Sequence, residues 1–540
     1  MNQTPAGLRA KIHDCIYFGL TVLTLSSLTV SKLWMSLFVF FIGINWLIEG
    51  NFAEKYRQLK THSAIFFISG VYLVFIIWFL LPAPSKLGAN YLLEKLPLLL
   101  YPLVIATSKP FSGKRLRTLL WTYVLTVFAV TCIGLGYLLG NPTLDLREIS
   151  PFIPLIRFAL SVVLSVFILL ILIHESVYKK TVNLLSYMLI AWFTGYLLIS
   201  KSITGLFLLV LCSGVYFLFY YKSRFKYFKA FVLSFFCIGI LGITYYSLSL
   251  YKNYSTETRY SIEELHQKTP FGNAYTHNFT SLVENGNRIE TFVCEEELRN
   301  SWNARSLVGY DSLIDKKFPL SIVLIRYLNS MGLKKDGASV NTLSLKDIRK
   351  IELGIANQEY TSIFSLKSYL YPIFFGYDLY RLKYSEGSSL FQRIEIWKRS
   401  FKKWKEKPVW GFGTGNTRAA LMAQREAEPQ YLPGKVETPH NQYISFLLSY
   451  GVIGFLTILI CLFLSVKYHR GFQSPFFGIF FVIMAVSCFF EDIIDTQAGF
   501  YFFFAFWTFF LFYKKQDFMT KFAVSYNKIT YFCSRLFLKP

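Results

Sequence analysis

Apolar residues along this chain come in long runs that are separated by short polar connectors. Most runs extend for roughly 17–25 residues, the length that an α-helix needs to cross the hydrocarbon core of a bilayer. No small-residue cleavage site follows the first run and a second run comes soon after it, so the first is expected to be retained as a span. The pattern predicts an all-α polytopic membrane protein. Its twelve expected spans are 14–31, 33–49, 64–81, 91–107, 118–139, 152–174, 182–200, 203–221, 230–250, 441–465, 475–490 and 498–513.

One long polar segment, residues 252–440, separates the ninth expected span from the tenth. Apolar positions three and four residues apart predict helices in SIEELHQK, SIVLIRYLNSMGL and SLKDIRKIELGIANQEY, and few strand-like alternations occur. A connector of this size without secondary structure would be improbable. The chain is therefore expected to divide into nine helices (1–251), a mostly helical inserted domain (252–440), three helices (441–513) and a tail (514–540).

The charge of the chain follows this expected topology. Of 540 residues, 54% are hydrophobic and 16% are charged, and the net charge is +24. One set of connectors, together with the tail, holds 23 Lys and Arg residues, whereas the opposite connectors and span ends hold 4 to 6. Because Lys and Arg concentrate on the cytoplasmic side, both termini are expected in the cytoplasm and residues 252–440 on the far face. The basic excess is thus a topology signal and gives no reason to expect a nucleic-acid partner.

The eight cysteines are scattered and form no CxxC pair, so a structural zinc site is not expected. Cys294 is the one cysteine within 252–440, which leaves that segment no second cysteine for an internal disulfide.

The stretch SSLFQRIEIWKRSFKKWKEKPVWGFGTGN, at the end of the insert, predicts an amphipathic helix over 390–405. Five apolar residues share one arc of its helical wheel: Leu390, Ile394, Trp397, Phe401 and Trp404. Lysines and arginines lie elsewhere on the wheel, Ile396 interrupts the pattern, and Pro408 is expected to stop the helix. A basic helix with tryptophans is typical of an anionic lipid interface, and Arg393 borders the apolar stripe one turn before Trp397.

GFGTGN (Gly411–Asn416) lacks the GK[ST] ending of a P-loop and does not follow a strand into a helix. Glycines favour a turn that reverses the chain after Pro408. They also allow backbone amides to approach an anion. Both interpretations stay open on the sequence alone.

His440 and Asn441 stand directly before the tenth expected span. The imidazole is a candidate acid–base group, although a histidine beside an interfacial helix also buries part of its ring without doing chemistry. Asn441 is a candidate helix cap. Arg157 lies a few residues into the sixth expected span, where an arginine either faces a partner or a wet cavity or reaches back to the surface. Lys201, in SKSITG, is a connector cation.

Three carboxylates, Glu491, Asp492 and Asp495, occur in EDIIDTQAG between the last two expected spans. Paired carboxylates suit acid–base work or a divalent ion. An acidic connector on the non-cytoplasmic face is also ordinary for a membrane protein. The sequence leaves both interpretations open.

Together these residues resemble the O-antigen ligase family, whose relatives include O-antigen polymerases and bacterial protein O-oligosaccharyltransferases. The family pattern R-x3-W, then P-x-x-G-x-G-x-G, then HN is similar to Arg393, Trp397, Pro408, Gly411, Gly413, Gly415, His440 and Asn441. An arginine at the start of the sixth span, a motif like Ser200–Gly205 and a closing pattern like Glu491–Gly499 extend the similarity, although Lys201 stands where arginine is common. The segment before Ser388 resembles that of a subset with an enlarged periplasmic domain.

The resemblance implies a glycosyltransferase of the bacterial inner membrane with its active site on the periplasmic face. It implies transfer, with inversion and without a metal or other cofactor, from an undecaprenyl-pyrophosphate-linked glycan to a hydroxyl of lipid A-core. His440 and Arg393 would be catalytic, the first as general base. The substrate-binding residues would be Arg157, Lys201, Trp397, Gly411, Gly413, Gly415, Asn441 and Glu491. A polymerase, a protein O-oligosaccharyltransferase and a lipid-linked glycan flippase stay open as alternatives.

Overall fold

The protein is described from a computed structural model that covers residues 5–62, 64–82, 84–111, 113–140, 149–174, 180–221, 225–314, 318–362, 365–383, 389–427 and 438–512. The predicted tail 514–540 lies outside these described residues. Within them helices dominate, and each of the few strands is two residues long. The predicted all-α class is therefore confirmed.

The chain forms two compact units. Unit 1 comprises Met1–Leu233 and Glu395–Pro540, and unit 2 comprises Ser234–Ile394. Two helices, α11 (Phe228–Ser255) and α18 (Ser389–Trp404), run across the boundaries between the units. The compact inserted unit ends at Ile394, whereas the predicted insert extends to residue 440, so the motif loop and His440 belong to unit 1.

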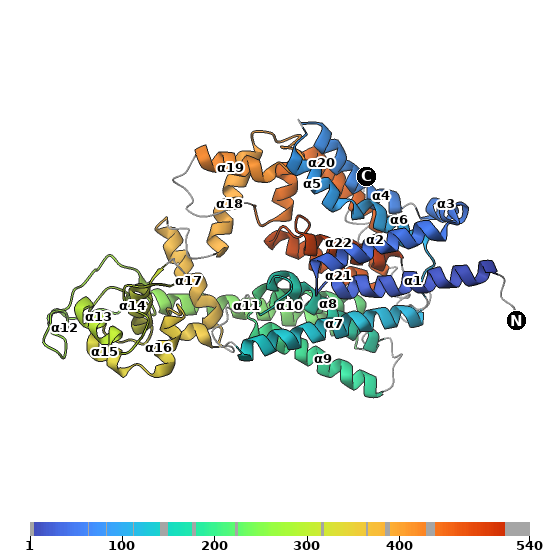
Figure 1. Ribbon diagram of the computed structural model, residues 1–540. Coiled ribbons are helices and arrows are strands. Elements are labelled where there is room, and N and C mark those ends of the chain that lie inside the picture. Colours follow the sequence, from blue (N-terminus) through green and yellow to red (C-terminus); the bar gives the residue numbers. More distant parts are fainter. Residues whose placement is uncertain are drawn as a thin grey trace. The chain divides into compact units, whose positions relative to one another are not determined.

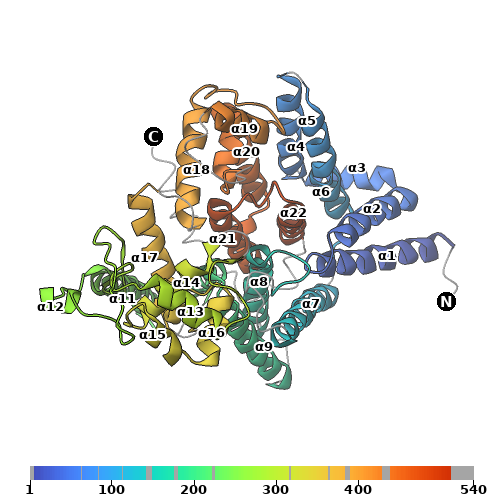
Figure 2. The same cartoon turned by 60° about the vertical axis from the view of Figure 1, so that its left-hand side comes forward.

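Unit 1 holds most of the long apolar helices. Before unit 2 these are α1 (Pro5–Ser27), α2 (Lys32–Glu49), α3 (Phe52–Thr61), α4 (Ala64–Leu80), α5 (Lys86–Lys95), α6 (Pro97–Thr107), α7 (Gly113–Gly140), α8 (Leu155–His174), α9 (Lys180–Ile199) and α10 (Ile203–Val215), which continues into η2 (Tyr216–Tyr220). After unit 2 they are α19 (Thr417–Ala427), α20 (Gln442–Tyr468), η5 (Gly471–Gln473), α21 (Pro475–Phe490) and α22 (Gln497–Phe512). In Figure 1 and Figure 2, α4, α5 and α20 lie at one end of this unit and α7, α8 and α9 at the other.

Eight helices of the described residues are long and apolar enough to cross a membrane, or up to nine if the bent pair α3 and α4 is one span. Each of the twelve predicted spans overlaps a helix or a pair of helices at its place in the chain. The short helices α21 and α22 have 16 residues each. The predicted span 91–107 is divided between α5 and α6, because Pro97 has no amide hydrogen to continue the preceding helix.

Two helices, α8 and α22, form the interior of unit 1. Of 20 residues in α8, 15 are buried, and of 16 in α22, 14 are buried. Both helices are apolar on all sides, as expected for a helix surrounded by other helices. Aromatic contacts join α22 to α21, with ring centroids 5.7 Å apart for Phe476 and Phe510 and 5.2 Å apart for Phe477 and Trp507. This packing fixes the short acidic turn that connects the two helices.

A break divides α20 at Gly451, where φ is 60° and ψ is −169°. The loop that follows Pro408 fills the break. Four backbone hydrogen bonds join them: from Phe412 to Leu448, from Gly413 to Ser449, from Val452 to Pro408 and from Ile453 to Val409. They satisfy the amides and carbonyls that the helix leaves unpaired at the break.

The glycines of GFGTGN are required by this close packing. Gly411, Gly413 and Gly415 have φ values of 69°, 93° and 77°, in the region where side chains are disfavoured. A Cβ at Gly411 would also lie 2.5 Å from the backbone nitrogen of Gly451. At Gly415 it would lie 2.6 Å from the Cα of Gly88.

Gly411→Ala is expected to destabilise the protein. The left-handed backbone alone costs about 1–3 kcal/mol with a side chain, and the contact with the backbone of α20 adds to this cost. Gly195→Ala is the matched control, since nothing lies within 4 Å of a Cβ at Gly195 in α9. Thermal unfolding in detergent should give a lower midpoint for Gly411→Ala and an unchanged or higher midpoint for the control. Equal midpoints for the two variants would contradict the packing described here.

Unit 2 has its own core, in which Trp302, Leu324 and Tyr327 are buried. Its elements are α12 (Ile262–Leu265), β1 (Val283–Glu284), β2 (Asn287–Arg288), α13 (Glu295–Asn303), β3 (Leu313–Ile314), β4 (Phe318–Pro319), α14 (Leu320–Ser330), α15 (Gly337–Thr342), α16 (Leu345–Glu352), η3 (Gln358–Thr361) and α17 (Lys367–Arg381). The strands form two antiparallel hairpins, β1 with β2 and β3 with β4. The three predicted helices are present as α12, α14 and α16, and each is shorter than its periodic stretch.

Candidate active site

The candidate site lies at the start of α20. Asn441 caps this helix, because its side-chain oxygen accepts hydrogen bonds from the amides of Tyr443 (3.0 Å) and Ile444 (3.2 Å). His440 directly precedes the cap and has a φ of 50°. Non-glycine residues adopt this left-handed conformation rarely, and it recurs at functional sites. The side chain of His440 is 42% exposed, so the imidazole is accessible.

Asp492 holds the backbone on which His440 stands. Its carboxylate accepts hydrogen bonds from the amides of His440 (2.8 Å) and Asn441 (3.0 Å) and from the hydroxyl of Ser445 (2.7 Å). Asp492 is only 3% exposed, and hydrogen bonds to a buried carboxylate are stronger than those between neutral groups. Its negative charge also lies at the N-terminus of α20, where the helix dipole stabilises anions. Asp492 therefore fixes the position of His440 without touching its ring.

Glu491, the residue before Asp492, faces the imidazole itself. Its Oε2 lies 3.7 Å from Nδ1 of His440, and the carboxylate is buried. Because Glu491 faces Nδ1, Nε2 is the ring nitrogen left for a substrate.

Trp397, in α18, contacts the segment directly before His440. Its indole Nε1 donates to the carbonyl of Pro439, the residue before His440, at 2.8 Å. Together with Trp404, it packs against Ile444 and Leu448 of α20. This bond gives Trp397 a definite place beside His440.

The rest of α18 differs from the predicted amphipathic stripe. Ile396, which interrupted the pattern, is buried with 4% of its surface exposed, whereas Phe401 on the stripe is 43% exposed. The helix ends at Trp404, four residues before Pro408. Ile396 rather than Phe401 is therefore a buried residue of this helix. The predicted location of α18 at a lipid interface stays a prediction.

Arg157 lies in the first turn of α8, and its guanidinium interacts electrostatically with Glu491 and Asp492. Its Nε is buried and has no hydrogen-bond partner among the described residues. Of the alternatives that the sequence left open, the structure favours an arginine that faces charged partners inside the protein. Arg157 and His440 are thus linked through the same two carboxylates.

Lys201 occupies a tight turn between α9 and α10, with a φ of 48°. Burial lowers its pKa. The hydroxyl of Ser202 caps α10 by accepting from the amide of Gly205 at 3.3 Å. A Cβ at Gly205 would lie 3.1 Å from that of Ala159, so the turn packs beside α8 close to Arg157. A direct role for Lys201 stays a prediction.

Arg393 lies in α18, one turn before Trp397, and belongs to unit 2. His440 belongs to unit 1. The predicted convergence of Arg393 with His440 therefore stays a prediction.

The amides of GFGTGN are engaged within the protein. Gly411 donates to the carbonyl of Lys407 at 2.9 Å, Gly413 donates to α20, and Thr414 donates to the carbonyl of Trp78 at 3.1 Å. These bonds favour the turn interpretation over one in which the amides bind an anion. Direct substrate binding by Gly411, Gly413 and Gly415 stays a prediction.

An apolar cavity of about 310 Å³ lies between α20, α21 and α22. Gln442 and Ile494 line it next to Asn441 and Asp492, and Leu462 lines it further along α20. Its surface is almost wholly apolar, which suits a hydrocarbon chain.

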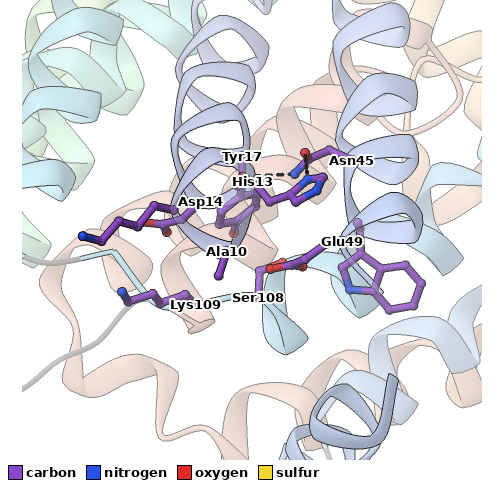
Figure 3. Close-up of a pocket in the computed structure, with 10 residues that line it drawn as sticks. Ala10, His13, Asp14, Tyr17, Asn45, Glu49, Ser108 and Lys109 are labelled. Atoms are coloured by element: carbon purple, nitrogen blue, oxygen red, sulfur yellow. Dashed lines mark hydrogen bonds between the residues drawn. The ribbon is translucent and has the colours of Figure 1, made fainter. Parts of the chain in front are cut away.

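A second, polar cavity of about 160 Å³ lies between α1, α2 and the segment after α6. Figure 3 shows Asp14 and Glu49 on either side of Tyr17 there, with His13 hydrogen-bonded to Asn45. The two carboxylates are paired inside the protein: Asp14 with Arg115 at 2.7 Å and Glu49 with Lys55 at 2.8 Å. None of the predicted site residues lines this cavity.

No specific role for Asp492 could be predicted from the sequence. The sequence drew attention to the acidic turn, but an ordinary surface connector fitted equally well, and only burial of Glu491 and Asp492 separates the two interpretations. Gln442 was missed altogether. Its Oε1 accepts from the amides of Ile494 (2.7 Å) and Asp495 (3.2 Å), which ties the turn to α20. Both residues lie beside the HN pair, but a lone sequence shows no pairing between positions 440 and 492.

Residues 351–459 match the family model described as O-Antigen ligase. This segment of the chain is thus assigned to the O-antigen ligase family. A search of curated proteins found no match. The matched segment contains Arg393, Trp397, the glycine loop and the HN pair, so the predicted resemblance is confirmed there. The assignment supports a glycosyltransferase-type enzyme that takes lipid-linked glycan substrates in a membrane.

Proposed function

We propose that this protein is an O-antigen ligase, which transfers a glycan from an undecaprenyl-pyrophosphate carrier to a sugar hydroxyl of lipid A-core on the periplasmic face of the bacterial inner membrane. One observation carries the proposal: an accessible imidazole, His440, is held by Asp492 through its backbone and lies 3.7 Å from Glu491. Transfer to a sugar hydroxyl requires a base that can reach the acceptor, and the exposed ring of His440 suits that role.

The proposed reaction is a single displacement with inversion at the sugar. A hydroxyl is a weak nucleophile at neutral pH, so a base must take its proton as the new C–O bond forms, which typically contributes about 10²–10⁴-fold. The acceptor oxygen attacks the anomeric carbon, and its proton passes to Nε2 of His440. The bond between that carbon and the pyrophosphate oxygen breaks, and the electron pair leaves with the pyrophosphate. Glu491 stabilises the imidazolium that results.

The leaving pyrophosphate needs charge stabilisation rather than an acid, because it is already stable as an anion. Arg157 is the cation best supported for this role, since it faces the carboxylates beside His440. Arginine has parallel N–H donors that match phosphate oxygens. Arg393 and Lys201 are assigned to the same anion by their motifs. The guanidinium of Arg393 and the ammonium of Lys201 would add positive charge to balance the pyrophosphate.

The apolar cavity supports a lipid-linked donor. The prenyl chain of such a carrier is attached directly to the pyrophosphate, so it must enter the membrane close to the reacting carbon. In lipid A-core, by contrast, the core sugars separate the acceptor hydroxyl from the acyl chains. The cavity between α20, α21 and α22 begins at Gln442, two residues after His440, which suits the chain of the donor.

The test is transfer by the purified protein in liposomes, with an undecaprenyl-pyrophosphate-linked glycan as donor. Three acceptors are supplied separately: lipid A-core, a second lipid-linked unit and a peptide. Extension of lipid A-core is expected. Extension of the second unit or the peptide would make the protein a polymerase or a protein O-oligosaccharyltransferase. If the donor crosses the bilayer and no acceptor is extended, the protein is a flippase and the proposal fails.

Ala485→Phe is expected to weaken binding of long-chain donors selectively, because Ala485 lines the cavity and a phenyl ring would fill part of it. The KM for the undecaprenyl donor should rise roughly tenfold, the effect of losing about 1.4 kcal/mol of apolar contact. The KM for a donor with a two-isoprene chain should not change. Ala191→Phe, at an exposed position of α9, is the matched control. Equal effects of Ala485→Phe on the two donors would rule the cavity out as the site of the chain.

A further inference from the structure

Lys95 is a buried cation that the proposed reaction does not use. It is the last residue of α5 and is fully buried. Its Nζ has no hydrogen-bond partner among the described residues and lies over two aromatic rings, 4.4 Å from the centre of Phe500 and 5.1 Å from that of Tyr91. Burying an ammonium is costly unless an anion compensates it. Lys95 therefore needs a compensating anion nearby.

Two carboxylates interact electrostatically with Lys95, of which Glu94 is exposed and Asp495 is the larger contributor. Tyr91 contacts both Lys95 and Asp495: its ring lies beneath the ammonium and its hydroxyl donates to Oδ1 of Asp495 at 2.9 Å. Burial raises the pKa of Asp495, and the neighbouring Asp492 raises it further. Lys95 acts in the opposite direction and favours the carboxylate. Lys95 thus helps to keep Asp495 ionised, together with the hydrogen bond from Tyr91.

The turn that contains Asp495 holds the start of α20 at two points. Its amides at Ile494 and Asp495 donate to Oε1 of Gln442. At the other point, the carboxylate of Asp492 accepts hydrogen bonds from the backbone amides of His440 and Asn441. A change of charge or position at Asp495 therefore acts on the segment that carries His440.

We propose that Lys95 is a positioning residue of this active site. Its ammonium balances Asp495, and the turn from 491 to 495 then keeps the geometry that places His440. The inference rests on the proposed function, in which His440 is the general base. Lys95 itself does not touch the substrate in this scheme.

The groups that interact with Asp495 come from several elements. Those that the structure identifies are Lys95 and Tyr91 from α5, Tyr450 and Gln442 from α20, Cys488 from α21 and Asp492 from the turn. Lys95 is the one cation in this described set. Replacing it with a neutral residue should therefore raise the pH at which Asp495 takes up a proton.

The experiment is a double-substitution cycle with Lys95→Met, Asp495→Asn and the double variant, measured as kcat for glycan transfer across a range of pH. Lys95→Met should lower kcat by roughly 10- to 100-fold, since a misplacement of about 1 Å costs on the order of 10². The acid limb of its profile of kcat against pH should also move to higher pH. The double variant, which restores charge balance, should recover most of the activity and the original limb. Lys86→Met, at the exposed start of the same helix, is the matched control.

Two results would overturn the inference. One is a Lys95→Met enzyme with wild-type kcat and an unmoved acid limb. The other is a double variant that is no more active than the single ones, which would mean that the two residues act independently. If Lys95→Met is made poorly in the membrane, the double variant still decides the question, because both of its side chains are neutral. His440→Gln separates the two proposals: its full activity would defeat the general-base mechanism, whereas its inactivity beside a normal Lys95→Met would defeat only this inference.

Discussion

His440→Gln is expected to abolish glycan transfer, with kcat lowered by about 10²–10⁴-fold, because glutamine has no basic nitrogen to accept the proton of the acceptor hydroxyl. The fold should not change. Asp492 binds the backbone amide at position 440, and that bond does not depend on the side chain. The KM for the donor should stay close to that of the wild type, since the proposed contacts to the pyrophosphate come from other residues.

The measurement is single-turnover transfer to lipid A-core by protein reconstituted at matched amounts. His266→Gln is the control, because His266 is exposed in unit 2 and has no part in the proposed site. It should transfer at the wild-type rate. Retention of transfer by His440→Gln at more than a tenth of the wild-type rate would show that another group is the base.

The sequence predicted the helices of this protein well because the signal for each of them is local. A run such as residues 152–174 is apolar on every side, and α8 lies where that run was expected. The role of Asn441 as a helix cap could also be predicted locally, because an asparagine before an apolar run caps a helix through contacts within three residues. What the pattern could not show was the break of α20 at Gly451, because neighbouring glycines inside an apolar run do not by themselves distinguish a straight helix from a broken one.

The remaining features depend on pairs of residues that are far apart in the chain. The glycines at 411, 413 and 415 are compatible with either a turn or an anion site until the backbone segments of α20 and α5 that pack against them are known. Asp492 is 52 residues from His440, and Lys95 is 400 residues from Asp495. Such pairings come from tertiary packing, so composition and spacing gave no access to them.

Asp492→Asn is expected to reduce transfer strongly although residue 492 touches no substrate in the proposed mechanism. Asparagine has nearly the same shape, but its amide group presents donors where the carboxylate presents an acceptor. At least one of the amides of His440 and Asn441 then loses its hydrogen-bond acceptor. The negative charge at the N-terminus of α20 is lost as well. Hydrogen bonds to a charged group are worth about 1.5–3 kcal/mol each, so kcat should fall by roughly 10- to 100-fold. The KM for the acceptor should change little, because the loss falls on the placement of the base.

Asp311→Asn provides the comparison, since Asp311 is an exposed carboxylate of unit 2 whose bidentate partner is Arg299. Loss of an exposed ion pair usually changes stability by less than about 1 kcal/mol, and transfer should be unaffected. Asp492→Asn should also lower the midpoint of thermal unfolding, because a buried amide without a partner destabilises the folded protein. A stable Asp492→Asn protein with normal kcat would show that the carboxylate is dispensable. His440 would then have to be placed by Trp397, through the carbonyl of Pro439, and by the cap at Asn441.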